Sequence, residues 1–189
     1  NDGRETFFLG EPVKNSMKIA FFHRKPKFNN FSVEGTFRVV REMLPPNVEC
    51  VVAQSRFDSS GLFRRLYNIV EAFFRQGDVN HITGDVHFLS YMLARDKTLL
   101  TILDCVAMYN TSGLKRSLIR ILWYVIPEKR VKLISVISES TKNELVKFIS
   151  CDPNKIRVIP VCISPGYFKT PKDFNSAKPR ILQVGTAKN

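Results

Sequence analysis

The stretch TLLTILDCVAMYNTSGLKRSLIRILWYVIPEKRVKLISVIS, residues 98–138, contains the pattern on which the expected fold rests. It starts with an apolar run that ends at Asp104, and it closes with a second apolar run at residues 132–138. Continuous apolar runs of this kind are typical of strands that are buried on both faces. Residues 114–126 have the length and spacing of a helix, which we expect Pro127 to end. The stretch therefore predicts strand, helix and strand, the repeating unit of a parallel sheet.

The same order repeats on both sides of this stretch. Strands that alternate with helices at such spacing predict right-handed crossovers and one parallel sheet with helices on both faces. The expected fold class is α/β, a doubly wound, Rossmann-like sheet. The further expected strands are residues 17–23, 48–55, 78–84 and 155–160, and the further expected helices are residues 33–44, 62–76, 86–94 and 139–149. Two of these helices carry an apolar stripe, formed by Phe37, Val40, Met43 and Leu44 in one and by Leu66, Ile69, Val70 and Phe73 in the other.

Length and composition are those of a globular protein. The 189 residues, 44% of them hydrophobic and 24% charged, suffice for one well-buried domain and exclude the disordered and fibrous classes. We expect an N-terminal extension at residues 1–16 and the sheet domain at residues 17–174. Residues 175–189 are expected to be a polar linker followed by a strand at 180–184, the first strand of a C-terminal domain that lies outside this sequence.

The chain is strongly basic. Its 29 Lys and Arg against 17 Asp and Glu give a formal charge of +12, which favours anionic partners such as nucleotide phosphates, acidic lipid or nucleic acid. Nucleic-acid binding is not expected, because no basic-aromatic platform or recognition-helix pattern accompanies the charge. Residues 113–132 do combine basic and aromatic side chains in one helical segment. They predict either a helix on an anionic membrane surface, with Lys115, Arg116, Arg120 and Trp123 as contacts, or a crossover helix with solvated charges.

Other patterns bear on location and on cofactors. The four cysteines show no CxxC and no Cys/His ligand spacing, so we expect reduced thiols and no metal site. The start lacks the order of a signal peptide, and the apolar window at residues 118–126 is too short and too charged to span a bilayer. These features predict a cytoplasmic protein, with peripheral binding at the inner face of the membrane as an option. The dinucleotide-binding, P-loop and nucleophile-elbow motifs are all missing, which disfavours dehydrogenases, P-loop enzymes and α/β-hydrolases.

Ligands of doubly wound sheets bind at the carboxyl ends of the strands, so the residues after each expected strand are the candidates for a site. Their mixture of cations, carboxylates, imidazoles and hydroxyls suits a phosphate-bearing or polyhydroxylated ligand, although strand ends are also polar simply because they meet water. The candidates are His23, Arg24, Lys25, Thr83, Gly84, Asp85, His87, Asp104, Cys105, Ser138, Glu139 and residues 161–164.

Three positions at this edge have a specific interpretation. Asp104 ends an apolar strand, so its carboxylate either accepts hydrogen bonds from sugar hydroxyls or caps the next turn. Asp85 and His87 are candidates for an acid-base pair, whereas His81, inside a strand, is interpreted as a core residue. Ser138 and Glu139 begin a helix, where the acid opposes a phosphate and favours a hydroxyl or cationic ligand.

Residues 132–171, KLISVISESTKNELVKFISCDPNKIRVIPVCISPGYFKTP, resemble the end of the N-terminal domain in retaining nucleotide-sugar glycosyltransferases of the family 4 type, which have the GT-B architecture. Upstream, DVNHITG at 78–84 and LTILDC at 100–105 are similar to further family segments. The matching residues of the first segment are Ser138, Glu139, Ser140, Leu145, Lys155, Ile156, Val158, Ile159, Pro160, Phe168 and Pro171.

The resemblance implies the acceptor-side domain of an enzyme that moves a sugar from a nucleotide-diphosphate-sugar to a glycan, lipid-linked or other hydroxyl acceptor. It implies metal-independent chemistry and no cofactor bound by this domain. Family members bind the donor mainly in a second domain, so we expect this chain alone to be inactive. On this basis Asp104 is the catalytic candidate, and the substrate-binding candidates are Asn29, Asn30, Asp85, His87, Ser138 and Glu139.

The chain departs from the family pattern at three places. Leu103 stands where the family commonly has a histidine, and Val161 and Cys162 stand where it has Asn-Gly. Residues 25–30, KPKFNN, replace a glycine pair, with Asn29 and Asn30 as stand-ins. These departures keep open a second interpretation, a binding module that retained the fold without catalysis.

Overall fold

The computed structural model describes residues 16–26, 32–163, 166, 168–169, 171 and 173–180. The expected extension up to residue 15, the candidates Asn29 and Asn30, and residues 181–184 of the expected C-terminal strand lie outside the described residues.

The described chain folds around one six-stranded sheet in which every neighbouring pair of strands is parallel. The spatial order is β2-β1-β3-β4-β5-β6, so the strand order reverses between β1 and β3. This confirms the predicted α/β, doubly wound, Rossmann-like fold class. Ligand sites in such sheets lie where the order reverses, beyond the carboxyl ends of the strands. The strands are β1 (Met17–His23), β2 (Val48–Gln54), β3 (Val79–Ile82), β4 (Thr98–Ile102), β5 (Leu133–Val136) and β6 (Ile156–Val158).

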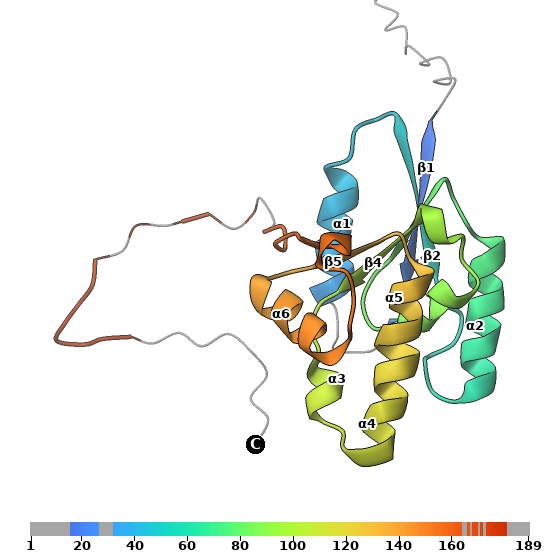
Figure 1. The fold of residues 1–189 in the computed structure, drawn as a ribbon. Helices are drawn as coiled ribbons and strands as arrows, with labels where there is room; N and C mark the ends of the chain where they lie inside the picture. The colour runs from blue at the N-terminus through green and yellow to red at the C-terminus, as the bar shows by residue number, and fades with distance from the viewer. Residues whose placement is uncertain are drawn as a thin grey trace, which may run out of the picture.

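Helices cover both faces of the sheet. On one face the strand side chains Phe22, Ile82, Leu100 and Ile134 belong to the hydrophobic core, together with residues of α2, η1 and α6. Successive strand residues point to opposite faces, and on the other face Phe21 and His81 contact α1 through Arg41 and Phe37. Figure 1 shows α4 and α5 following one another as one long helical rod, with α2 beside it. The helices are α1 (Ser32–Glu42), α2 (Leu62–Phe74), η1 (His87–Tyr91), η2 (Arg95–Lys97), α3 (Val106–Tyr109), α4 (Gly113–Ile119), η3 (Arg120–Val125), α5 (Ile126–Arg130), α6 (Glu139–Phe148) and η4 (Pro153–Lys155).

Two of the predicted helices were wrong in type or extent. The segment at 86–94 is a five-residue 3-10 helix, η1, rather than an α-helix. Four consecutive residues of η1 are buried, so packing on several sides determines its structure rather than a helical period. Pro127 does not end the helix of residues 114–126, because helical structure continues from α4 through the π-helix η3 into α5 and reaches Arg130.

The apolar stripe predicted for α2 is largely exposed. Leu66, Val70 and Phe73 are 48%, 47% and 42% exposed, and only Ile69 of the four is buried. The helix turns Asn68, Ile69 and Ala72 toward the sheet instead. The stripe of α1 is also only partly buried: Phe37 lies in the core, whereas Met43 is exposed beyond the end of the helix. Apolar periodicity therefore located these helices but did not identify the face that packs on the sheet.

Candidate functional site at the carboxyl edge of the sheet

A cavity of about 590 Å³ opens at the carboxyl edge of the sheet, beside the reversal of strand order. Three strand ends contribute to it: Arg24 follows β1, Gly84 and Asp85 follow β3, and Leu103 and Asp104 follow β4. Its position is the one that the doubly wound topology predicts for a ligand. The remaining lining comes from Val33 of α1, His87 of η1, Val106 and Ala107 of α3, Asn110, and Trp123 and Tyr124 of η3.

Acidic groups outnumber cations at this cavity. The Nε of Arg24 donates to Glu34 Oε1 at 3.0 Å, and its Nη1 lies 3.6 Å from Asp85 Oδ1. Glu34 sits next to the lining residue Val33, and its second oxygen, Oε2, is buried with no hydrogen-bond partner among the described residues. The site therefore presents carboxylate oxygens as hydrogen-bond acceptors, which suits a ligand that carries hydroxyl donors.

Of the two interpretations offered for Asp104, the structure shows the capping of the next turn. Its Oδ1 accepts a hydrogen bond from the Val106 N–H at 3.1 Å and so caps the short helix α3. The same side chain is exposed and lines the cavity. The neighbouring thiol of Cys105 is not a nucleophile at neutral pH, because burial, and then the charges of Glu144 and Asp104, raise its pKa to about 12.

The helix that contains Trp123 has two backbone carbonyls available to side chains. Ile126 N–H bonds to the carbonyl of Ile121, five residues back, and Pro127 has no N–H to offer Trp123. The carbonyl of Trp123 accepts from His87 Nδ1 at 2.7 Å, and the carbonyl of Leu122 accepts from the hydroxyl of Tyr91 at 2.5 Å. Both donors belong to η1, so η1 stabilises the π-helix by satisfying its backbone.

This contact defines the state of His87. The ring is buried, which lowers its pKa, while the hydrogen bond to Trp123 and the charges of Asp85 and Asp104 act in the opposite direction. His87 is neutral at pH 7, and its Nδ1 carries the proton that bonds to Trp123. Its observed role is to hold η1 against η3 beside the cavity.

Trp123 forms one wall of the site. Its indole Nε1 donates to the carbonyl of Asp85 at 3.3 Å, and its ring packs edge-on against Phe88 with centroids 5.8 Å apart. The guanidinium of Arg65 from α2 lies 4.6 Å from the ring centroid, which is cation-π distance. The indole is thus fixed by contacts with three separate elements of the fold.

A second histidine, His23, ends β1 directly before the lining residue Arg24. His23 Nε2 is 3.0 Å from Arg41 Nη1, and its Nδ1 is 2.9 Å from Thr83 Oγ1. The guanidinium can only donate, so Nε2 is the acceptor and Nδ1 carries the proton. Burial, then the charge of Arg41, lowers the pKa of His23 to about 4, so this side chain is also neutral at pH 7.

The structure brings together five of the candidate site residues. Arg24, Gly84, Asp85, His87 and Asp104 line the same cavity. Ser138 and Glu139 do not line it: Ser138 Oγ caps α6 by accepting from the Thr141 N–H at 3.1 Å, and Glu139 is exposed in the first turn of that helix.

The predicted membrane contacts lie on and beside η3. Arg116 stacks over the Phe148 ring at 5.5 Å, and Arg120 donates to the Phe148 carbonyl at 3.4 Å. Lys115 is exposed, and Trp123 is partly buried.

Sequence reasoning missed Glu34 and Asn110 as members of this region. Glu34 could have been found, since it lies in the first turn of the helix after β1, where ligands of doubly wound sheets bind. Asn110 had no such signal, because the short helix α3 alone places it at the cavity.

The described residues contain neither a candidate metal site nor a candidate membrane span. No group of three His, Cys, Asp or Glu side chains there could hold a metal ion. Within the same residues, no helix has the length and apolar character needed to cross a membrane.

No protein-family model matches the chain, and no curated protein matches it significantly.

Proposed function

We propose that this chain is the acceptor-side domain of a retaining glycosyltransferase with GT-B architecture, which moves a sugar from a nucleotide-diphosphate-sugar to a hydroxyl acceptor. The observation that carries the proposal is the acid-rich cavity at the strand reversal, which Asp85 and Asp104 both line, with Glu34 bonded to the lining residue Arg24 in the first turn of α1. Carboxylate oxygens are strong acceptors for sugar hydroxyls. The resemblance of residues 132–171 to the end of such a domain gives independent support.

In this proposal the domain binds and orients the acceptor. Asp104 holds a hydroxyl of the bound sugar with the oxygen that does not cap α3, and Asp85 is kept in place by Arg24. The donor nucleotide binds to a second domain of the same enzyme, as the resemblance implies. The step is metal-independent and takes place in the cytoplasm.

The test uses the full-length product of the gene. Transfer of labelled sugar from a panel of nucleotide-sugars is measured for the wild type, for Asp104→Asn and for the control Asp96→Asn. Asparagine retains the oxygen that caps α3 but removes the charge, so kcat/KM should fall at least about tenfold. Asp96 is exposed in η2, at the amino end of β4, so the control should behave like the wild type. An unchanged rate for Asp104→Asn removes this residue from the mechanism, and a wild type that transfers no sugar refutes the proposal.

A non-catalytic binding module is the second candidate. The observation that favours it is Leu103, which puts an apolar side chain in the cavity where the family commonly has an imidazole. Sugar binding detected by saturation-transfer NMR, together with no transfer by the full-length protein, would establish this alternative.

We also propose that the protein associates peripherally with the inner face of the membrane. The exposed apolar side chains of α4 and η3 lie among the cations Lys115, Arg116 and Arg120, and this combination favours an anionic surface. Flotation with liposomes should recover the protein with anionic lipid and lose it when Lys115 and Arg116 are changed to glutamate. Absence of binding to anionic liposomes contradicts the proposal.

A further inference from the structure

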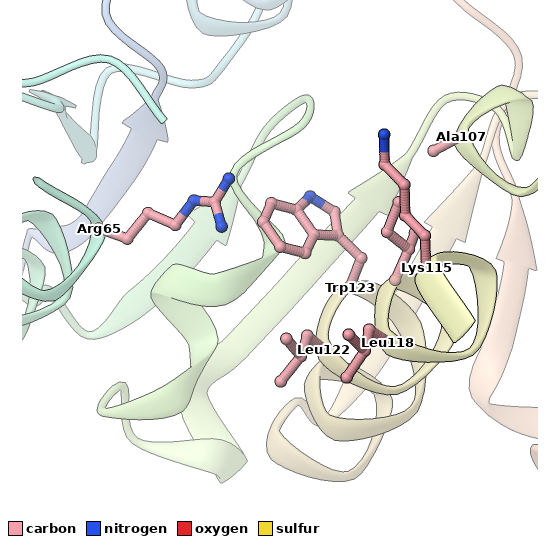
Figure 2. A pocket seen from close by; sticks show the side chains of 7 residues that line it. Arg65, Ala107, Lys115, Leu118, Leu122 and Trp123 are labelled. Atoms are coloured by element: carbon pink, nitrogen blue, oxygen red, sulfur yellow. The ribbon is translucent and has the colours of Figure 1, made fainter. Parts of the chain in front are cut away.

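A second cavity of about 340 Å³ lies between α2 and the rod of α4 and η3. Its floor and walls are the side chains of Leu118, Ile119, Leu122 and Trp123. Figure 2 shows the guanidinium of Arg65 pointing toward the indole of Trp123 from one side, with Lys115 on the other side and the two leucines below. The cavity is therefore an apolar groove with a cation on each side.

The groove adjoins the acid-rich cavity at the sheet edge. Ala107 and Trp123 line both cavities. The indole N–H is already bonded to the Asp85 carbonyl, so the part of Trp123 left to the groove is apolar ring surface. A ligand that passes Trp123 goes from an apolar to a polar environment within the width of one side chain.

The charged side chains that line the groove are all positive. Arg65 and Lys115 line it, and no acidic side chain does. Neither cation is in an ion pair within the described part of the chain, where Arg65 bonds through Nε to the Ser59 carbonyl at 2.7 Å. Two unpaired cations beside apolar side chains complement an anionic group attached to a hydrocarbon chain.

The lining argues against a peptide as the occupant. It contains no hydroxyl and no amide side chain, and the indole N–H has its partner already. A peptide backbone laid there would leave its N–H and C=O groups without partners, which is costly. A hydrocarbon chain has no polar groups that need hydrogen-bond partners.

We propose that this groove binds the hydrocarbon chain of an amphiphile whose anionic head group lies at Lys115, one of the two flanking cations, and whose polar end reaches the acid-rich cavity past Trp123. Its volume equals that of roughly ten water-sized groups, so a chain of about ten carbons fits. The inference rests on the proposed function and narrows it, because the acceptor is then a lipid-linked sugar rather than a free glycan.

Trp123 is the only tryptophan of the chain, so intrinsic fluorescence reports directly on this groove. The 189-residue protein is titrated with decyl phosphate below its micelle threshold, with decanol and with inorganic phosphate. We expect a saturable blue shift with decyl phosphate, weaker binding of decanol and no shift with inorganic phosphate. A shift with inorganic phosphate alone overturns the proposal. So does a shift that appears only with phosphatidylglycerol vesicles, which indicates a membrane surface instead of a chain-binding groove.

Matched variants distinguish binding in the groove from nonspecific hydrophobic binding. Leu118→Gln, at a half-exposed position, should weaken decyl phosphate binding at least about tenfold by removing apolar contact. Leu133→Gln changes another exposed leucine, at the start of β5 and outside the groove, and should leave binding unchanged. Lys115→Gln should weaken binding of decyl phosphate but not of decanol. Equal affinity of wild type and Leu118→Gln for decyl phosphate refutes the inference.

The binding assay needs no sugar donor, so the two proposals can fail separately. Decyl phosphate binding by the 189-residue protein, together with no sugar transfer by the full-length protein, refutes the proposed function and leaves a lipid-binding groove. Sugar transfer by a protein that does not bind decyl phosphate refutes the groove alone.

Discussion

His81 is expected to make the stability of the fold depend on pH. Its ring lies in β3 between Phe21 and Phe37, at centroid distances of 5.3 and 5.1 Å, and its Nε2 is 2.7 Å from Thr101 Oγ1. Burial lowers the pKa of His81 from 6.5 to about 4, with a further contribution from the charge of His23. Between these two pH values the unfolded chain binds more protons at this residue than the folded chain does.

The direction and size of the effect follow from this difference. The contribution of His81 to stability is complete above pH 6.5 and is lost as the pH falls toward 4. Proton linkage converts the shift to a loss of about 2 kcal/mol at pH 5 relative to pH 7.5.

The assay is urea unfolding of wild type and His81→Gln at pH 7.5 and at pH 5. Glutamine keeps a hydrogen-bonding side chain next to Thr101 but cannot be protonated. The free energy of unfolding of the variant should fall between the two pH values by about 2 kcal/mol less than that of the wild type. His23 is present in both proteins, so its own titration largely cancels. Equal losses in the two proteins, or an NMR titration of His81 with a midpoint near 6.5, would refute the reasoning.

Two further predictions concern packing and charge. Gly77→Ala should destabilise the fold by about 2 kcal/mol in urea unfolding, because its Cβ would lie 2.6 Å from the Lys18 carbonyl oxygen. Gly35→Ala, with nothing within 4 Å of the new Cβ in α1, should be neutral or stabilising, and equal losses for both would contradict this account. Lys155→Met should cost about 3 kcal/mol, because it removes the partner of Glu128, 2.9 Å away in a pair whose side chains are both only 13% exposed. Adding Glu128→Gln to Lys155→Met should recover much of the lost stability, which thermal unfolding measures. If the effects of the two substitutions simply add, the two side chains are not coupled.

The fold could be predicted because its strands are nearly continuous apolar runs separated by helices of regular spacing. Such a pattern indicates strands that are buried on both faces, and it therefore predicts a parallel sheet. It does not report which face of a helix packs on the sheet. In α2, Asn68 and Ile69 are buried, whereas Leu66 is 48% exposed. An exposed apolar face and a buried one have the same period in the sequence.

The site could be predicted only where position along the chain determines position in space. Asp85, His87 and Asp104 follow strands, and the carboxyl ends of parallel strands meet at one edge. Trp123 was predicted as a membrane contact, and its place as a wall of two cavities depends on distant residues. No local pattern contains the contact with Arg65 of α2 or the hydrogen bond to the Asp85 carbonyl.

The π-helix explains why those contacts occur together. A regular α-helix would use the Leu122 carbonyl for the N–H of Ile126, but the wider turn directs that N–H to Ile121. Pro127, four residues after Trp123, has no N–H to donate to the Trp123 carbonyl. Both groups lie on the side that faces η1, which supplies two donors and fixes the rotation of this turn. Trp123 is therefore held between the polar and the apolar cavity by backbone hydrogen bonds rather than by its own packing alone. A wall of this kind can separate the polar end of an amphiphile from its hydrocarbon chain without moving.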